Sequence, residues 1–463
     1  MQIRSFPTTT VLALIASAPL SVVDLTALPK VLPVLNQPIP NITAQANADS
    51  DSYDLTARFS MKEIDDNVVR FTSQVSNNSR VMDFAMFSNG TPNTRANFLK
   101  YVNDGDYNNS FVHRSVPGFV VQGGGYYNST PEATLTVTSV PTDAPIANEF
   151  GVSNTLGTIS MAKLGGDPNS ATSGWFVSLG DNSENLDNQN GGFTVFARIT
   201  KDTLASAQTF GNPVQYPIWK LSENPSSPFT NVPLITSFTG GSVADTDLLL
   251  FPTVTIVPLP AGQAGESTTL TYSVVGNTNP AVSASVDVNG QLQISYVPDS
   301  SGRGIVSVRA TDSVGNTVDD NITIEVQRTY DLWRSSVFSV ADAADDNISG
   351  PDVSNGTALT NMELYLHGRA IAEREDNAVV FSNTKISNSD YPTFSFTFYN
   401  LAAGITFAIQ ESTDLGVTDN WKTVPHTVIN QSRSGNIDSM IIRSKSPTTS
   451  ANTFYRLIFT LTE

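Results

Sequence analysis

The chain has 463 residues, which is too long for a single hydrophobic core and predicts about three domains. Its net charge of −18 argues against nucleic acid as a partner, because phosphate binding requires clustered lysine and arginine. The sequence contains no cysteine, which excludes disulfides, thiolate metal sites and a cysteine nucleophile.

The N-terminus has the pattern of a secretory signal. Arg4 supplies a positive charge, and residues 11–18 form an apolar run that is too short to span a bilayer. We therefore expect residues 1–27 to be a signal peptide and the protein to be secreted or held at the cell envelope, in the periplasm or on the cell surface. A disordered leader is the alternative. Residues 28–52 are rich in proline, which denies a regular helix, so this stretch is predicted to be a linker.

Strand and helix signals begin at residue 53. Residues 68–72 and 81–87 are short β-rich runs separated by an Asn/Ser turn, which predicts a strand on either side. Two helices are expected among the strands, one from Thr91 to about Val102 and one over residues 203–210 with Asp202 as its cap.

The stretch FVHRSVPGFVVQGGG, residues 111–125, combines apolar strands with polar side chains. An apolar strand normally excludes arginine, because an unpaired charge is costly to bury, yet Arg114 lies in one. Pro117-Gly118 indicates a turn, and residues 119–122 are predicted to form the second strand of a hairpin. The hairpin presents Arg114 and Gln122 beside Phe119. Taken alone, these residues fit a surface hairpin whose arginine meets a carboxylate equally well.

This stretch resembles the signature of the cyclophilins, the peptidyl-prolyl cis/trans isomerases. Three further blocks are similar to the family in order and spacing, and the resemblance covers about residues 55–240. The blocks are Asn97-Phe98-Leu99 with Gly105-Asp106-Tyr107, then residues 157–162 with 169–173 and Trp175-Phe176-Val177, and last Leu186-Asp187 with residues 193–197. The resemblance implies a mainly β fold for residues 53–240, a closed antiparallel β-barrel with two short helices.

The resemblance also implies the activity, which is rotation of X-Pro bonds without a covalent intermediate, a metal or a cofactor. Arg114 matches the family's catalytic arginine, with Gln122 and Phe119 beside it. The implied partners are proline-containing polypeptides. The implied substrate-binding positions form an apolar floor and an edge that contacts the peptide: Val120, Ala162, Lys163, Phe176, Leu186 and Phe193. For the phenylalanines, ordinary barrel core is the alternative.

Three positions depart from the family pattern. Gly174 replaces a second glutamine, Asn185 replaces a tryptophan, and Phe193 stands where the family has a histidine or tyrosine. The asparagine is expected to loosen one wall and to remove sensitivity to the cyclic-peptide inhibitor. His113 precedes the arginine as in the family, and we expect a structural hydrogen bond from it.

The rest of the chain is predicted to be β-rich. Residues 212–240 contain five prolines and are expected to be a peripheral excursion. Residues 250–327 alternate at period two from residue 254 onward, which predicts a β-sandwich, and the turn at 310–316 resembles those of bacterial Ig-like and cadherin-like repeats. Residues 331–463 are predicted to form a C-terminal β module, also sandwich-like.

The C-terminal module begins with an Asp-rich turn, residues 342–356, and a helix over 359–366. This pair resembles a degraded form of an element of bacterial surface proteins. Ile348, Pro351 and Val353 interrupt the carboxylates, so we expect no calcium site. Strands are predicted at 393–399, 406–411 and 454–461, and Trp333 and Trp421 are expected in the core.

Three functions remain open. The first is a secreted isomerase that acts on exported or surface proteins. The second is a module that captures proline peptides with weak turnover, which Gly174 and Asn185 favour. The third is an adhesion or matrix protein whose residues 250–463 bind cells, polysaccharide, cell-envelope or extracellular matrix components.

Overall fold

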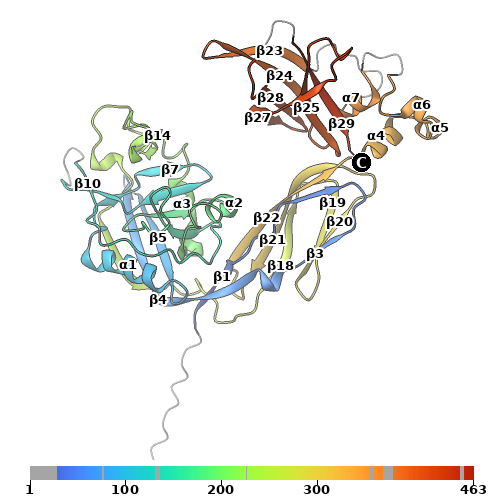
Figure 1. Ribbon diagram of the computed structural model, residues 1–463. Helices are drawn as coiled ribbons and strands as arrows, with labels where there is room; N and C mark the ends of the chain where they lie inside the picture. The colour runs from blue at the N-terminus through green and yellow to red at the C-terminus, as the bar shows by residue number, and fades with distance from the viewer. Residues whose placement is uncertain are drawn as a thin grey trace, which may run out of the picture.

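The computed structural model places the chain in three β-rich bodies that follow one another in Figure 1. It describes residues 29–75, 78–130, 136–225, 227–354, 359–368, 379–448 and 453–462. The predicted signal peptide therefore lies outside the described residues. Within these ranges, no helix is long and apolar enough to cross a membrane.

The first body is built on a long antiparallel sheet with strand order β1-β4-β5-β13-β11-β12-β8-β7, and β17 also pairs with β4. The hydrogen-bonded path among the described residues runs from β1 at one end to β7 at the other. The strands are β1 Val31–Leu35, β4 Phe59–Val75, β5 Asn78–Phe87, β7 Arg114–Val116, β8 Val120–Gly123, β11 Thr158–Met161, β12 Trp175–Ser178, β13 Val195–Ile199 and β17 Thr253–Pro258.

Helices and two small sheets surround this sheet. The helices are α1 Pro92–Asp104, α2 Ser183–Leu186, α3 Lys201–Phe210, and the 3-10 turns η2 Pro228–Thr230 and η3 Asp245–Asp247. A further 3-10 turn, η1 Leu55–Ala57, packs Leu55 into the core of the second body. One small sheet has the order β10-β9-β6-β16, with β6 Ser110–Phe111, β9 Tyr126–Asn128, β10 Val137–Ser139 and β16 Leu250–Phe251. The other pairs β14 Ile218–Trp219 with β15 Val232–Pro233 inside the predicted excursion.

Both predicted helices are present, and one predicted cap is wrong. Pro92 occupies the first turn of α1, and Gly105 ends it in the left-handed conformation with φ 76°. Helix α3 begins at Lys201, because Thr200 has extended backbone and serves as the N-cap. Asp202 therefore lies in the first turn instead of capping it, where its carboxylate still favours the helix dipole.

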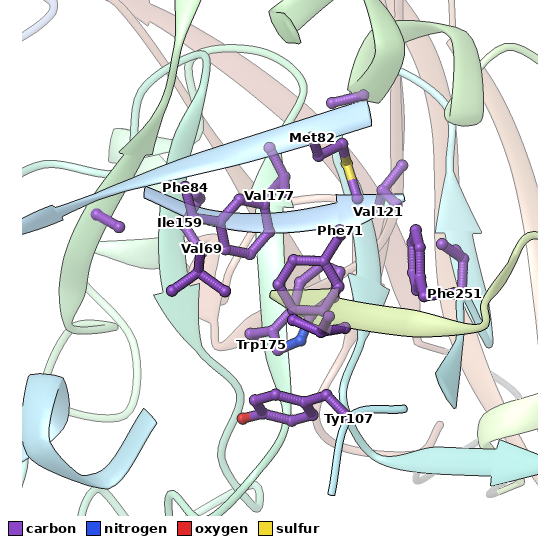
Figure 2. Close-up of a cluster of buried hydrophobic side chains, with 14 of the residues drawn as sticks. Val69, Phe71, Met82, Phe84, Tyr107, Val121, Ile159, Trp175, Val177 and Phe251 are labelled. Carbon is purple, nitrogen blue, oxygen red and sulfur yellow. The ribbon is translucent and has the colours of Figure 1, made fainter. Parts of the chain in front are cut away.

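Aromatic side chains fill the core of the first body (Figure 2). Trp175 is fully buried, with ring centroids 5.0 Å from Phe71 and 5.1 Å from Phe84. Gly123 is the cross-strand neighbour of Trp175 in the β8–β12 pair. A Cβ on Gly123 would lie 2.6 Å from Cζ2 of the indole, so glycine is required for the tryptophan to pack. The packing of Trp175 therefore requires glycine at the last position of β8.

The second body combines strands from both ends of the first 327 residues. One sheet has the order β18-β21-β22-β2, and the facing strands follow the order β19-β20-β3. Figure 1 shows β3, in blue, beside the yellow strand β20. The strands are β2 Ile42–Gln45, β3 Asp51–Asp54, β18 Thr271–Asn277, β19 Val282–Val286, β20 Gln291–Tyr296, β21 Gly302–Thr311 and β22 Thr317–Gln327.

The predicted linker is wrong, because residues 28–52 contain β1, β2 and the start of β3. Strand β1 pairs with β4 of the first body, and β2 pairs in parallel with β22 of the second. Pro33 lies in β1, which is the terminal strand of its sheet, where a missing N–H is tolerated.

Residues 254–257 were predicted to be part of the sandwich of the second body, but they lie in the first body. They lie in β17, which pairs with residues 67–72 of β4 and not with the sandwich strands. Strand β1 covers only residues 59–63 of the same long strand, and β17 adds a second partner to it. The remaining predicted strands of this region correspond to β18, β20, β21 and β22.

Side chains of the first body contact the second. Buried Arg198 on β13 donates to the Pro33 carbonyl, and its Nη2 donates to the Thr317 carbonyl at 3.1 Å. Lys201 Nζ donates to the Val314 carbonyl at 2.8 Å. Burial lowers the pKa of Arg198 to about 10, which leaves it cationic at neutral pH. The two bodies therefore share polar contacts as well as a chain segment.

The third body has four short helices and two facing sheets, counted over the described residues. The sheet orders are β23-β24-β28-β27 and β26-β25-β29. The helices are α4 Tyr330–Val337, α5 Val340–Ala343, α6 Asp346–Ser349 and α7 Asn361–Leu366. The strands are β23 Val379–Ile386, β24 Ser389–Tyr399, β25 Ile405–Ser412, β26 Lys422–Val424, β27 His426–Ser434, β28 Ile437–Ser444 and β29 Phe454–Leu461. The predicted strands and the predicted helix are present.

The Asp-rich turn folds into caps and ion pairs. Asp345 caps α6 by accepting from the Asn347 N–H at 2.9 Å, and Asp346 lies 3.1 Å from Arg334. The described residues contain no group of three or more His, Asp or Glu side chains that could hold a metal ion. Trp333 is buried as predicted, whereas Trp421 is partly exposed and stacks under Arg456, 4.2 Å from the guanidinium carbon.

Candidate active site

The predicted hairpin carries the polar groups of the site. Strands β7 and β8 pair antiparallel with Arg114 opposite Gln122. Gly118 adopts φ 72° in the turn between them, and the Phe119 N–H donates to the Val116 carbonyl at 3.0 Å. Cross-strand partners project to the same side of a sheet, so the hairpin places the guanidinium and the amide next to each other.

Arg114 is a partly desolvated cation. Its Nη1 donates to Gln122 Oε1 at 3.4 Å, and burial lowers its pKa from the usual arginine range. No carboxylate lies within ion-pair distance of Arg114 in the part of the chain that the structure describes. An arginine remains protonated in proteins, so the guanidinium keeps its charge and its unused donors. Gln122 restrains one side of it without neutralising it.

An apolar slot lies beside the guanidinium. Its floor is a small cluster in which Val120, Phe176 and Leu186 are each 5% exposed or less. The rings of Phe176 and Phe193 meet edge to face at 5.7 Å. The pocket has a volume of about 230 Å³, which is below the 300–1,000 Å³ typical of sites for drug-sized ligands and suits one small ring. Its lining residues are Arg114, Phe119, Val120, Gln122, Ala162, Lys163, Phe176, Leu186, Gln189 and Phe193.

All nine residues predicted for the site line this one pocket, and Gln189 is a tenth that the sequence did not indicate. Gln189 Nε2 donates to Asn185 Oδ1. It lies in a loop whose conformation depends on several left-handed residues, so its direction was not predictable from sequence spacing.

Of the three positions that depart from the family pattern, only Phe193 lines the slot. Gly174 does not line the pocket itself, but its carbonyl accepts from the Ala162 N–H at 2.9 Å. A Cβ on Gly174 would lie 3.3 Å from Ala162 Cβ, so Ala162 packs closely against this glycine. Asn185 is exposed and does not line the pocket. The wall at this point is therefore formed by Gln189 and Phe193.

His113 differs from its predicted role. The imidazole is 3% exposed and packs edge to face on Tyr126 at 5.0 Å. Its Nδ1 is buried and has no hydrogen-bond partner among the described residues. Burial, aided by the neighbouring Arg114 charge, lowers the pKa of His113 to about 3, so the ring is neutral. His113 contributes packing behind the hairpin, and the expected hydrogen bond is not made at Nδ1.

The lining defines what the pocket can do. It contains an arginine, a lysine, two glutamines and apolar side chains, with no carboxylate, histidine, serine or threonine. The side chains supply hydrogen-bond donors and positive charge. Burial lowers the pKa of Lys163, but the hydrogen bonds that its Nζ makes within the described residues are both donated to main-chain carbonyls. This set suits a reaction in which no covalent bond is made and charge develops on a bound group.

Known proteins share the segment that contains the pocket. Residues 71–211 match the sequence profile of the family described as cyclophilin type peptidyl-prolyl cis-trans isomerase/CLD. The peptidyl-prolyl cis-trans isomerase of Acinetobacter baylyi is 34% identical over 136 residues, which are 28% of this chain and 68% of that protein. Peptidyl-prolyl cis-trans isomerase A of Dickeya dadantii is 35% identical over 137 residues, 28% of this chain and 67% of that protein.

The crystal structure of a Cryptosporidium parvum cyclophilin type peptidyl-prolyl cis-trans isomerase covers 42% of this chain and 99% of its own, with 19% identity and a TM-score of 0.27. The match of residues 71–211 includes every predicted site residue.

Proposed function

Since the chain belongs to the cyclophilin-type peptidyl-prolyl cis-trans isomerases, we propose that it rotates X-Pro bonds of extended, accessible polypeptide segments in the pocket beside Arg114. The observation that carries the proposal is the pairing of an unneutralised guanidinium with an apolar slot of about 230 Å³, which has room for a proline ring. The floor of Val120, Phe176 and Leu186 holds the ring.

The mechanism follows from amide chemistry. The X-Pro bond rotates over a barrier of roughly 18–20 kcal/mol because resonance gives it double-bond character. As the bond twists, the nitrogen becomes pyramidal and gains a lone pair, and a fixed cationic donor stabilises this state more than the planar one. Arg114 is that donor. Gln122 orients the guanidinium from the facing strand and leaves donors free for the substrate backbone.

The magnitude can be tested directly on the full chain. A preorganised donor of this kind is worth about 3 kcal/mol, so Arg114→Ala should lower kcat/KM about 100-fold in a protease-coupled assay of an X-Pro peptide. Arg95→Ala is the matched control, since Arg95 lies on α1 and pairs with Asp65 at 2.6 Å without lining the pocket. A wild-type chain that gives no acceleration, or an Arg114→Ala chain that matches the control, contradicts the proposal.

The full chain is the right material for this assay. Residues 53–240 alone lack β1 and β17, both partners of β4. A fragment with these boundaries would expose the edge of β4 and invite aggregation. An inactive fragment would then say nothing about the pocket.

A second function has specific support. Gly174 has no side chain that could contact a bound peptide, and exposed Asn185 gives the pocket no aromatic wall. Both features favour a module that captures proline peptides and turns them over slowly. Peptide binding can be measured by fluorescence anisotropy. Saturable binding, together with an isomerisation rate that is the same in the wild type and in Arg114→Ala, would favour this function over catalysis.

The clients are proposed to be exported or surface proteins. The support is the leader pattern of Arg4 with the apolar run at residues 11–18, together with the two β-rich bodies that follow the isomerase. Expression with the native N-terminus, fractionation and N-terminal sequencing test this assignment. A chain that stays in the cytosol with its leader intact contradicts it.

A further inference from the structure

The rim of the slot carries a second cation whose side chain is fixed in place. We propose that Lys163 makes the isomerase prefer substrates with an acidic side chain next to the proline. The inference rests on the proposed function and names the class of segment that the pocket selects. It is carried by the hydrogen bonds of the ammonium group and by the charge distribution of the lining.

The ammonium of Lys163 is held by main-chain carbonyls. Its Nζ donates to the Asn190 carbonyl at 2.9 Å and to the Gly192 carbonyl at 2.6 Å. It also lies 4.6 Å from the centroid of the Phe193 ring, in cation–π range. An ammonium has three donors, so these contacts leave one for a ligand at the rim. A lysine anchored in this way does not lose further side-chain entropy when it pairs with an anion.

The loop that supplies these carbonyls has an unusual backbone. Asn190, Gly191 and Gly192 are consecutive left-handed residues with φ 51°, 74° and 74°. The Asn148 amide donates to the Gly191 carbonyl at 2.6 Å and to the Gly192 carbonyl at 3.1 Å, which holds the loop from the other side. The loop carbonyls therefore accept hydrogen bonds from both Asn148 and Lys163. These bonds keep the ammonium of Lys163 next to Phe193, at the edge of the slot.

The pocket is positive although the chain is strongly negative. Arg114 and Lys163 both line it, no carboxylate does, and the whole chain has a net charge of −18. Within the described ranges neither cation has an ion-pair partner, and the charge of Asp167 acts on Lys163 without an ion-pair contact. An approaching acidic side chain would thus find two unpaired cations beside an apolar floor.

The geometry of a bound segment brings its neighbours to this rim. Consecutive Cα atoms are 3.8 Å apart, so the residues before and after a seated proline lie over the edges of a slot this small. A glutamate or aspartate there can reach the ammonium. Charge pairs at partly exposed rims are modest, and we expect a preference of about three- to fivefold in kcat/KM over the uncharged amide.

Exchange NMR on short peptides of the forms Ala-Xaa-Pro-Ala and Ala-Ala-Pro-Xaa tests the inference on the full chain, with Xaa as Glu, Gln or Lys. The expected result is a Glu-to-Gln ratio of about three to five at one of the two positions, with Lys below Gln. The ratio should be about one in Lys163→Gln, persist in Lys163→Arg, and shrink between 20 mM and 500 mM salt. Because it compares peptides on one enzyme sample, a loss of stability in a variant does not alter it.

Two outcomes overturn the inference. A wild-type ratio near one at both positions does so, and so does a ratio that survives in Lys163→Gln. Titrations of the same peptides separate this failure from failure of the proposed function. No exchange with any peptide, together with tighter binding of the Glu forms, removes the isomerase and keeps the selectivity. Absence of both exchange and selective binding removes both.

Discussion

Asp320 on β22 is a carboxylate that the fold buries. Asp320 is 1% exposed, and its Oδ2 accepts a hydrogen bond from the Ile39 N–H at 2.8 Å. Burial, with a smaller contribution from Asp181, raises the pKa of Asp320 from 3.8 to about 7, and Arg58 only partly opposes this. Between these values the folded chain binds more protons than the unfolded chain, so stability falls as the pH rises from 4 to 7.

The substitution Asp320→Asn removes this cost. The difference between 3.8 and about 7, at roughly 1.4 kcal/mol for each pH unit, sets an upper limit of about 4 kcal/mol at pH 8. The amide oxygen still accepts from the Ile39 N–H. For a body of fewer than 100 residues, each kcal/mol shifts Tm by about 4–8 °C, so the variant should melt up to about 16–32 °C above the wild type at pH 8 and near it at pH 4.

Scanning calorimetry at pH 4 and pH 8 measures this effect on the transition of the second body. Asp319→Asn is the matched control, because Asp319 directly precedes Asp320 on β22. Its side chain is partly exposed and pairs with Arg309 at 2.7 Å. Its loss should change stability by about 1 kcal/mol or less and leave the pH dependence in place. If the Asp320→Asn and wild-type chains lose the same stability between pH 4 and pH 8, the burial argument is refuted.

Two further predictions concern the first body. Gly123→Ala places a Cβ 2.6 Å from the buried Trp175 indole and should lower the free energy of unfolding by about 1–3 kcal/mol, measured by chemical denaturation. Gly151→Ala is the control and should be nearly neutral, because nothing lies within 4 Å of its Cβ. Equal denaturation midpoints for the two variants would refute the packing argument. His113 has a pKa lowered from 6.5 to about 3, so the unfolded chain binds the extra proton and the first body should lose up to about 1.4 kcal/mol per pH unit as the pH falls from 6.5. His113→Phe should flatten that slope in calorimetry, and an unchanged slope would contradict it.

Local chemistry made the site predictable. Pro117 and Gly118 specify the turn that sets Arg114 opposite Gln122, two residues that are only eight positions apart in the sequence. The blocks that resemble the cyclophilins then indicated Phe176, Leu186 and Phe193, which the structure brings to the same pocket. Gln189 was missed because its position depends on the left-handed loop at residues 190–192. The roles of these residues stay predictions.

Non-local pairing made the rest unpredictable. The prolines of residues 28–52 argued for a linker, yet β1, β2 and β3 find partners in β4, β22 and β20. Nothing in the sequence of β2 shows that its partner lies at the end of the second body. Closure of the first sheet into a barrel, and the immunoglobulin-like character of the second body, also stay predictions.

The parallel pairing of β2 with β22 has a consequence for synthesis of the chain. The Thr323 N–H donates to Asn41 Oδ1 across a sequence separation of 282 residues. At about 5–20 residues per second, a ribosome would finish β22 roughly 15–60 s after β2 has emerged. During that interval β2 cannot pair with β22. Its unpaired backbone groups can bind a chaperone or pair wrongly with a neighbouring nascent chain.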